Sequence, residues 1–158
     1  MRYFISIDPG SSGSMCALSD SGEVHFKDFK DEDLKGYITW IQDVISIHGS
    51  PTMVAIEKVH AMPGQGVTSM FSFGQRLGEL EGMLQTLNLG YELVPPKTWQ
   101  KPCGIVMPKK ATPALKKKTT YTTISKLYPD APLTGPKGGI IDGRCDALGI
   151  AHHLRIKY

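Results

Sequence analysis

The stretch that decides the fold is Tyr3-Phe4-Ile5-Ser6-Ile7-Asp8-Pro9-Gly10. It joins a run of apolar, strand-forming residues to a Pro-Gly turn signal, and so predicts a buried strand that ends at Asp8. A second run, Met53-Val54-Ala55-Ile56-Glu57, predicts another buried strand that also ends in an acid. Burial disfavours a lone charge, so each of these carboxylates needs a partner. We therefore expect Asp8 and Glu57 to belong to a functional site.

Two further acids lie near the end of the sequence. Asp142 and Asp146 are four residues apart within the largely apolar segment 141–150. On a helix this spacing places both carboxylates on one face, about 5 to 6 Å apart at Cβ. Hard divalent cations prefer clusters of oxygen ligands. Together with Asp8 and Glu57, the two acids predict the site of a metal-dependent nuclease.

The composition limits the class of protein. The chain has 158 residues, 41% of them hydrophobic, which predicts a single domain over residues 1–158 with a sizeable core. Its three cysteines are odd in number and far apart, which disfavours a disulfide framework and favours a reducing compartment. No apolar run approaches the length of a membrane span. We expect a soluble intracellular protein that has no membrane partner.

The lysines are unevenly distributed. The net charge of +3 is too small to indicate a polyanionic partner by itself. Eight lysines, however, crowd a stretch that holds almost no acid: Lys97, Lys101, Lys109, Lys110, Lys116, Lys117, Lys118 and Lys126. A solvated surface explains any one of them, whereas eight together favour a flank that faces a polyanion.

The predicted elements give a mixed α/β order. Three strands at residues 3–8, 14–19 and 23–29 are expected to form an antiparallel meander. The next helix, with Asp31 or Asp33 as its N-cap, leads to the fourth strand. The later elements are a fifth strand at 91–94, a helix over 113–127 that begins at Pro113, and a last helix that carries Asp142 and Asp146.

The helix after the loop 60–66 carries two stripes. Its N-cap is expected to be Thr68 or Ser69. The apolar stripe consists of Met70, Phe73, Leu77, Leu80, Leu84 and Leu87, and the glycine stripe of Gly74, Gly78 and Gly82. Because each glycine weakens a helix by roughly 1 kcal/mol, the second stripe indicates the close approach of another backbone. Either both stripes pack within one core, or the helix is shared with a second subunit.

In this order and spacing, the motifs resemble the RuvC-like Holliday junction resolvases of the RNase H-like nuclease superfamily. The resemblance covers nearly the whole chain and rests on residues 7–10, 56–57, 73–78 and 146–148. It implies a five-stranded mixed sheet flanked by helices. It also implies a dimeric endonuclease of DNA recombination and repair that nicks four-way junctions using magnesium. The small size is more similar to phage or organellar relatives, which would act in the bacterial host cytoplasm or the organelle matrix.

The resemblance also implies roles for the acids. Asp8 would bridge two Mg²⁺ ions, for which Mn²⁺ could substitute, Glu57 would lie towards one of them, and Asp142 with Asp146 would complete the pair. Bacterial members place their last two acids three residues apart, where this chain has Gly143. The role passes to Asp142 because both spacings keep the acids on one helix face.

DNA contacts are expected on either side of these acids. The family places a lysine near the scissile phosphate, and Lys117 or Lys118 is favoured over Lys116 for that role. The wider DNA-binding set is predicted to be His60, Met62, Gln65, Lys101, Lys109, Lys110, Lys116, Lys117 and Lys118. Phe71, like Met62, could wedge against unstacked bases, while core packing is favoured for Phe73. Trp99 either stacks on DNA or lies half-buried in the core, and the core is favoured.

Three alternative functions are open. The chain could be a catalytically silent junction-binding protein, but such a protein would not need the four acids. It could be another RNase H-like nuclease that acts on RNA. The run Asp8-Pro9-Gly10-Ser11-Ser12-Gly13-Ser14 also resembles the phosphate hairpin of actin-like ATPases. That superfamily clasps its nucleotide between two such domains, and 158 residues supply one.

Overall fold

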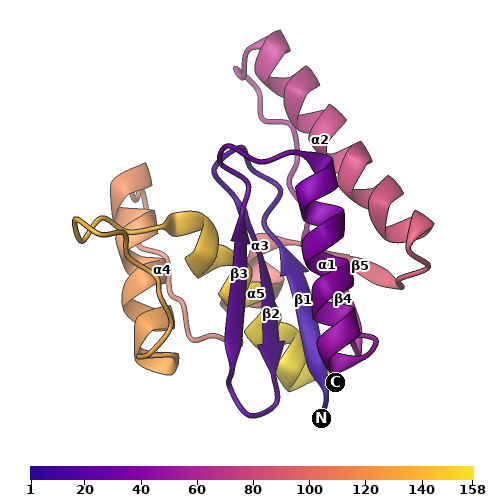
Figure 1. Cartoon of the computed structure of the whole chain (residues 1–158). Coiled ribbons are helices and arrows are strands. Elements are labelled where there is room, and N and C mark those ends of the chain that lie inside the picture. The colour runs from indigo at the N-terminus through magenta and orange to yellow at the C-terminus, as the bar shows by residue number, and fades with distance from the viewer.

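Five strands form one mixed sheet in the computed structural model, which describes all residues from Met1 to Tyr158. The strands are β1 (Tyr3–Ile7), β2 (Ser14–Ser19), β3 (Val24–Asp28), β4 (Met53–Glu57) and β5 (Tyr91–Val94). Their order in the sheet is β3-β2-β1-β4-β5; the first three pair antiparallel, and β4 and β5 run parallel to β1 (Figure 1). The predicted five-stranded mixed sheet, a meander followed by parallel strands, is confirmed.

Five helices flank the sheet: α1 (Leu34–His48), α2 (Val67–Thr86), α3 (Pro96–Gln100), α4 (Pro113–Leu127) and α5 (Asp142–Lys157). Local capping explains where two of them begin. Asp33, rather than Asp31, caps α1 by accepting a hydrogen bond from the Gly36 N–H at 3.0 Å. Thr112 caps α4 through the Leu115 N–H at 3.2 Å.

Two local features differ from the sequence prediction. Helix α2 begins at Val67 after an extended Gly66, so Thr68 and Ser69 lie inside the first turn and neither is the N-cap. A turn closed by the Gln65 N–H on the Met62 carbonyl brings the chain to this earlier start. The short helix α3 escapes prediction because five residues are too few to show a helical period.

Helices cover both faces of the sheet, which explains why β1 and β2 are buried along their whole lengths. On one face, α1 and the C-terminal half of α2 pack over a core that includes Ile5 and Ile7. On the other face, α3, α4 and α5 pack around Phe4, Trp99 and Leu148. No helix is both long enough and apolar enough to cross a membrane.

Helix α2 divides into a packed half and an exposed half. Its later stripe residues, Leu80 and Leu84, are fully buried, whereas Met70 is 40% exposed and Phe73 belongs to neither core. The glycine stripe of Gly74, Gly78 and Gly82 packs against nothing, because a Cβ atom on any of them would meet no atom within 4 Å. The interpretation that both stripes pack within one core is therefore wrong, since the sheet ends before the first turns of α2, which project beyond it (Figure 1).

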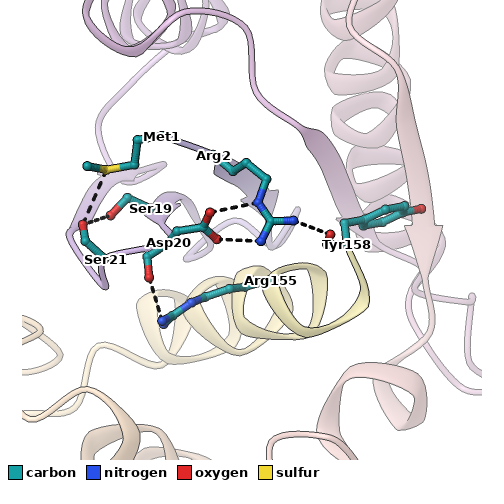
Figure 2. A network of polar contacts seen from close by, with 7 residues as sticks. All are labelled: Met1, Arg2, Ser19, Asp20, Ser21, Arg155 and Tyr158. Atoms are coloured by element: carbon teal, nitrogen blue, oxygen red, sulfur yellow. Dashed lines mark hydrogen bonds and ion pairs between the residues drawn. The ribbon is translucent and has the colours of Figure 1, made fainter.

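Polar contacts close the end of the sheet where β1 begins. The Arg2 guanidinium donates to the Asp20 carboxylate at 2.9 Å and to the Tyr158 backbone oxygen at 2.5 Å (Figure 2). Arg155 donates to the Asp20 backbone oxygen at 2.7 Å. The C-terminal end of α5 is thereby tied to the loop between β2 and β3 and to the start of β1.

Candidate metal centre

Three carboxylates meet at the opposite end of the sheet, where β1 and β4 finish. These strands are parallel neighbours with Ile7 opposite Ile56, so Asp8 and Glu57, the residues that follow, lie side by side. Asp146 reaches the same place from the second turn of α5. One carboxylate oxygen of each residue lies within 4.8 Å of the other two. We call Asp8, Glu57 and Asp146 the acid cluster.

Two contacts fix the start of α5 against the sheet. The buried Ser6 hydroxyl donates to the Ala147 carbonyl at 2.5 Å, which holds the neighbouring Asp146 beside the end of β1. Gly143 packs on the turn between β1 and β2, where a Cβ atom would lie 2.3 Å from the Ser12 carbonyl oxygen. No side chain fits at position 143, so an acid three residues before Asp146 is sterically excluded and the acid stands at Asp142 instead.

Asp142 lies beside the acid cluster rather than within it. Its Oδ2 atom is 3.2 Å from the Nζ atom of Lys117 on α4. The Asp142 charge nevertheless acts on the cluster, because it raises the pKa of both Asp8 and Asp146. The structure thus gathers three of the four predicted metal ligands and holds the fourth next to them through an ion pair.

Burial and the charges of nearby acids raise the pKa of all three clustered acids. Burial raises the pKa of Asp8 to about 6, against the hydrogen bond that its Oδ1 atom accepts from the Gly10 N–H at 3.2 Å. Burial and then the Asp8 charge raise the pKa of Glu57 to about 7. Burial followed by the charges of its acidic neighbours raises the pKa of Asp146 well above its usual value, although Lys117 lowers it.

The donor set fits a hard divalent cation. All three groups of the acid cluster offer carboxylate oxygens, which Mg²⁺ and Mn²⁺ prefer over nitrogen or sulfur. The site is rich in negative charge and lacks an internal cation, since the one lysine nearby pairs with Asp142. Such repulsion is relieved by a bound metal ion or by protonation.

The predicted DNA-contacting loop lies next to this centre. His60, Met62 and Gln65 are all exposed. Gln65 uses its side-chain oxygen to accept the Met62 N–H at 3.0 Å, which leaves its amide nitrogen free for another partner. His60, Gln65 and Phe73 line an open cavity of about 680 Å³ that also borders the turn after Asp8. Phe73 is thus a lining residue here rather than the core residue expected from its place in the apolar stripe.

The predicted lysines are exposed on α3–α4 and their connection. Of the three consecutive lysines, Lys117 faces the acids, while Lys116 and Lys118 form no ion pair. Exposed side chains without an acidic partner are also found at Lys101, Lys109 and Lys110. These positively charged groups remain available to an anionic ligand.

Sequence reasoning missed two contacts in this region. The core position favoured for Trp99 is confirmed, since this residue is 1% exposed and cannot stack on DNA, but the hydrogen bond that its indole N–H directs at Glu57 was not foreseen. Arg144 makes a bidentate pair with Asp28 at 2.9 and 2.8 Å and donates to the Pro132 carbonyl, which ties the first turn of α5 to β3. The only signal for Arg144 is a cationic side chain between two acids in the first turns of α5; no pattern links Trp99 to Glu57.

Comparison with known proteins identifies similar structures but no similar sequences. No family model matches the sequence, and no curated protein matches it. The structure of Thermus thermophilus RuvC in complex with a Holliday junction substrate aligns over 96% of this chain and 91% of its own, with 16% identity and a TM-score of 0.59. A second Thermus thermophilus RuvC structure aligns over 98% and 96%, with 15% identity and the same TM-score.

A weaker match is the yeast mitochondrial Holliday junction resolvase Ydc2, with 16% identity and a TM-score of 0.48 over 99% of this chain and 80% of its own. The alignments with the two RuvC structures span nearly the whole chain. The protein therefore has the RuvC-like, RNase H-like fold expected from its sequence motifs.

Proposed function

We propose that this protein is a structure-selective endodeoxyribonuclease that resolves four-way DNA junctions by paired, metal-dependent hydrolysis of phosphodiester bonds. The observation that carries the proposal is the acid cluster: three carboxylates from β1, β4 and α5 converge within 4.8 Å and have raised pKa values. Perturbed acids gathered in this way are typical of functional sites. The RuvC-like fold and the lysines beside the cluster support DNA as the substrate.

The chemistry assigns a task to each group. Asp8, Glu57 and Asp146 would hold Mg²⁺, or Mn²⁺ in its place, with Asp142 available as a fourth carboxylate. Bound metal would supply the Lewis acidity and the activated water that phosphodiester hydrolysis needs. Lys117 would bind the scissile phosphate. Its ion pair with Asp142 beside the acids supports this role, because the ammonium group needs only to exchange Asp142 for a phosphate oxygen.

The lysine flank would bind the DNA backbone. Each phosphate contact contributes about 0.9 to the slope of log affinity against log salt for duplex binding. The triple substitution of Lys116, Lys117 and Lys118 by Gln should therefore flatten that slope by about two to three. Lys35→Gln, an exposed lysine on α1 over the other face of the sheet, is the control and should leave the slope unchanged. An unchanged slope in the triple variant would place the DNA elsewhere.

We propose that the exposed half of α2 binds a second copy of the chain, because two equivalent strands of a junction must be cut. The glycine stripe is open, and Val67 and Phe71 nearby are 85% and 74% exposed. Gly78→Leu creates no clash within one copy and improves helix propensity, so it should block association without weakening the fold. Gly90→Leu, at an open site outside α2, is the control. Sedimentation of a wild-type monomer that still makes paired nicks would contradict the dimer.

One assay separates the candidate functions. The protein is incubated with an end-labelled four-way junction, a linear duplex and an RNA–DNA hybrid, each with and without Mg²⁺. Paired symmetrical nicks in the junction alone, dependent on Mg²⁺, are expected. Junction binding without cleavage would favour a silent binding protein, and cleavage of the hybrid would favour an activity on RNA. Hydrolysis of ATP in a parallel reaction that contains ATP and no nucleic acid would favour the alternative that residues 8–14 form the phosphate hairpin of an actin-like ATPase.

A further inference from the structure

Trp99 lies in the core between the sheet and α5. It is 1% exposed and comes from the short helix α3, which follows the edge strand β5. Its ring packs against the backbone of α5 at Gly149, where a Cβ atom would lie 2.5 Å from the ring carbon Cζ3. Gly149 therefore provides the space that lets the indole approach the helix carrying Asp146.

The indole N–H is directed at the acid cluster. Trp99 Nε1 lies 3.4 Å from the Oε1 atom of Glu57, a long hydrogen bond. An indole nitrogen can only donate, so it favours the charged form of the carboxylate and fixes which side of Glu57 faces the protein interior. No other group in the chain donates to Glu57, and Trp99 alone determines its orientation through hydrogen bonding.

We propose that Trp99 is a positioning residue for the metal ligand Glu57, and that its indole ring senses occupancy of the metal site. The inference rests on the proposed metal-dependent function. Groups that hydrogen-bond to metal-ligating carboxylates orient them, and removing such groups commonly weakens metal binding by about 10- to 100-fold. Trp99 holds one oxygen of Glu57 and so restricts the rotation of the carboxylate that lies beside Asp8 and Asp146.

The first test uses Trp99 as a reporter. The chain has two tryptophans, and Trp40 lies on α1, on the other face of the sheet. In the Trp40→Phe variant, all tryptophan emission comes from Trp99. Titration with MgCl₂ alone should change this emission saturably, while the Trp40 emission of a Trp99→Phe variant should stay constant. An emission that does not respond, in a protein whose thermal midpoint rises with Mg²⁺, would overturn the proposal.

The second test measures metal binding by calorimetry. Trp99→Phe keeps an aromatic ring and removes only the donor, so its Mg²⁺ dissociation constant should rise about tenfold, the lower end of the usual range because the bond is long. The cleavage rate at saturating Mg²⁺ should remain within about threefold of wild type, which a general loss of structure would not allow. Trp40→Phe should bind Mg²⁺ as wild type does. A dissociation constant for Trp99→Phe within twofold of wild type would overturn the positioning role.

The two proposals fail separately. Mg²⁺ binding that Trp99 reports, in a protein that cuts no junction, would refute the nuclease and retain the role of Trp99. Junction cleavage by the wild type, with an unaltered Mg²⁺ affinity in Trp99→Phe, would retain the nuclease and refute the role of Trp99. If neither calorimetry nor emission detects Mg²⁺ binding, the metal site itself is wrong and both proposals fall.

Discussion

The carboxylates that lie at the two ends of α5 differ in their surroundings. At the C-terminal end, Asp20 accepts hydrogen bonds from Arg2 on its side chain and from Arg155 on its backbone oxygen (Figure 2). At the N-terminal end, three carboxylates share one partly buried site, and the neighbouring Lys117 pairs with Asp142 outside it. The same helix thus joins an end with paired charges to an end with repelling ones.

This difference shows what each end contributes. Paired surface charges add little to stability, about 0 to 1 kcal/mol per pair, but they cost little to maintain. A cluster of acids with raised pKa values lowers the stability of the metal-free fold at neutral pH. Folding alone would favour apolar residues in its place. The acid cluster is therefore compatible with a site that binds a cation from solution.

The largest expected effect is the loss of cleavage in Asp146→Asn. Metal ligands contribute several kcal/mol to the transition state, so junction cleavage should fall by roughly three orders of magnitude. Junction binding should persist, because a negative charge beside the phosphate is removed. Asp130→Asn, an exposed acid in the 128–141 loop, should cleave normally in the same gel assay. Retention of a tenth of wild-type cleavage by Asp146→Asn would break the distinction between the two ends.

Asp142→Asn tests whether Asp142, which lies beside the acid cluster, also binds the metal. An amide binds a hard cation far more weakly than a carboxylate, so cleavage should fall by about two orders of magnitude if Asp142 completes the ligand set. The rate is measured on the same junction at saturating Mg²⁺. Full activity would show that the four-residue spacing is coincidental, and the site would shrink to Asp8, Glu57 and Asp146.

The pH dependence of stability should reveal the cluster directly. The folded state holds the protons of Asp8 and Glu57 up to pH about 6 and 7, whereas the unfolded chain releases them near pH 4. The metal-free protein should therefore lose about 2 to 4 kcal/mol of unfolding free energy as the pH rises from 4 to 8. Urea titrations at several pH values measure this loss, and Mg²⁺ should reverse it at pH 8 but not at pH 5.

Two histidines should raise the unfolding free energy with increasing pH over part of the range from pH 4 to 8. Burial lowers the pKa of His152 and His153, so their contribution to stability rises with pH up to the unfolded pKa of about 6.5 and is constant above it. The contribution of the acid cluster to the pH dependence is therefore taken as the difference in unfolding free energy between wild type and Asp146→Asn at each pH. Identical pH profiles for these two proteins would mean that the acids do not repel one another in the folded state.

Arg144 provides an intermediate case, because it lies two residues before Asp146 on α5 but forms an ion pair with Asp28 on β3. Its guanidinium lowers the pKa of Asp28, and the pair stabilises the fold above pH about 4 and loses this effect below it. With both side chains partly exposed, Arg144→Met should lower the unfolding free energy by about 1 to 2 kcal/mol at pH 7. Arg144→Lys should recover only part of this unfolding free energy, because lysine keeps the positive charge but cannot pair in a bidentate manner. Full recovery of the unfolding free energy in Arg144→Lys would contradict the bidentate geometry as the cause.

Much of this arrangement could be predicted from local sequence. The apolar runs before Asp8 and Glu57 predict two strands and the position of each acid at a strand end, and β1 and β4 confirm both. The resemblance to the resolvases placed Asp146 with them. These predictions succeed because each depends on a short, continuous pattern of burial.

The remaining features depend on contacts between distant segments. The Trp99–Glu57 and Arg144–Asp28 contacts join residues 42 and 116 positions apart, and no periodicity encodes them. The stripe of α2 was predicted correctly as helical, but its pattern could not show that the sheet ends before Met70 and Phe73. Gly143 was visible as a departure from the family spacing; only the packed turn at Ser12 explains why no side chain is accepted there.

The smallest effect is expected at the paired end, from Arg2→Gln. The Arg2 side chain is 54% exposed and that of Asp20 33%, so solvent and salt screen the pair, and its loss should lower the unfolding free energy by less than about 1 kcal/mol. A double-mutant cycle with Asp20→Asn isolates the interaction, and its coupling energy should shrink further in 1 M salt. Arg2 also holds the Tyr158 backbone oxygen, so the single variant should lose slightly more than the coupling energy. Neither variant should alter cleavage, because the helix that separates them from the acids is anchored independently by Ser6 at its start. If cleavage fell with Arg2→Gln, the two ends of α5 would be mechanically coupled, and the contrast between a structural end and a functional end would have to be abandoned.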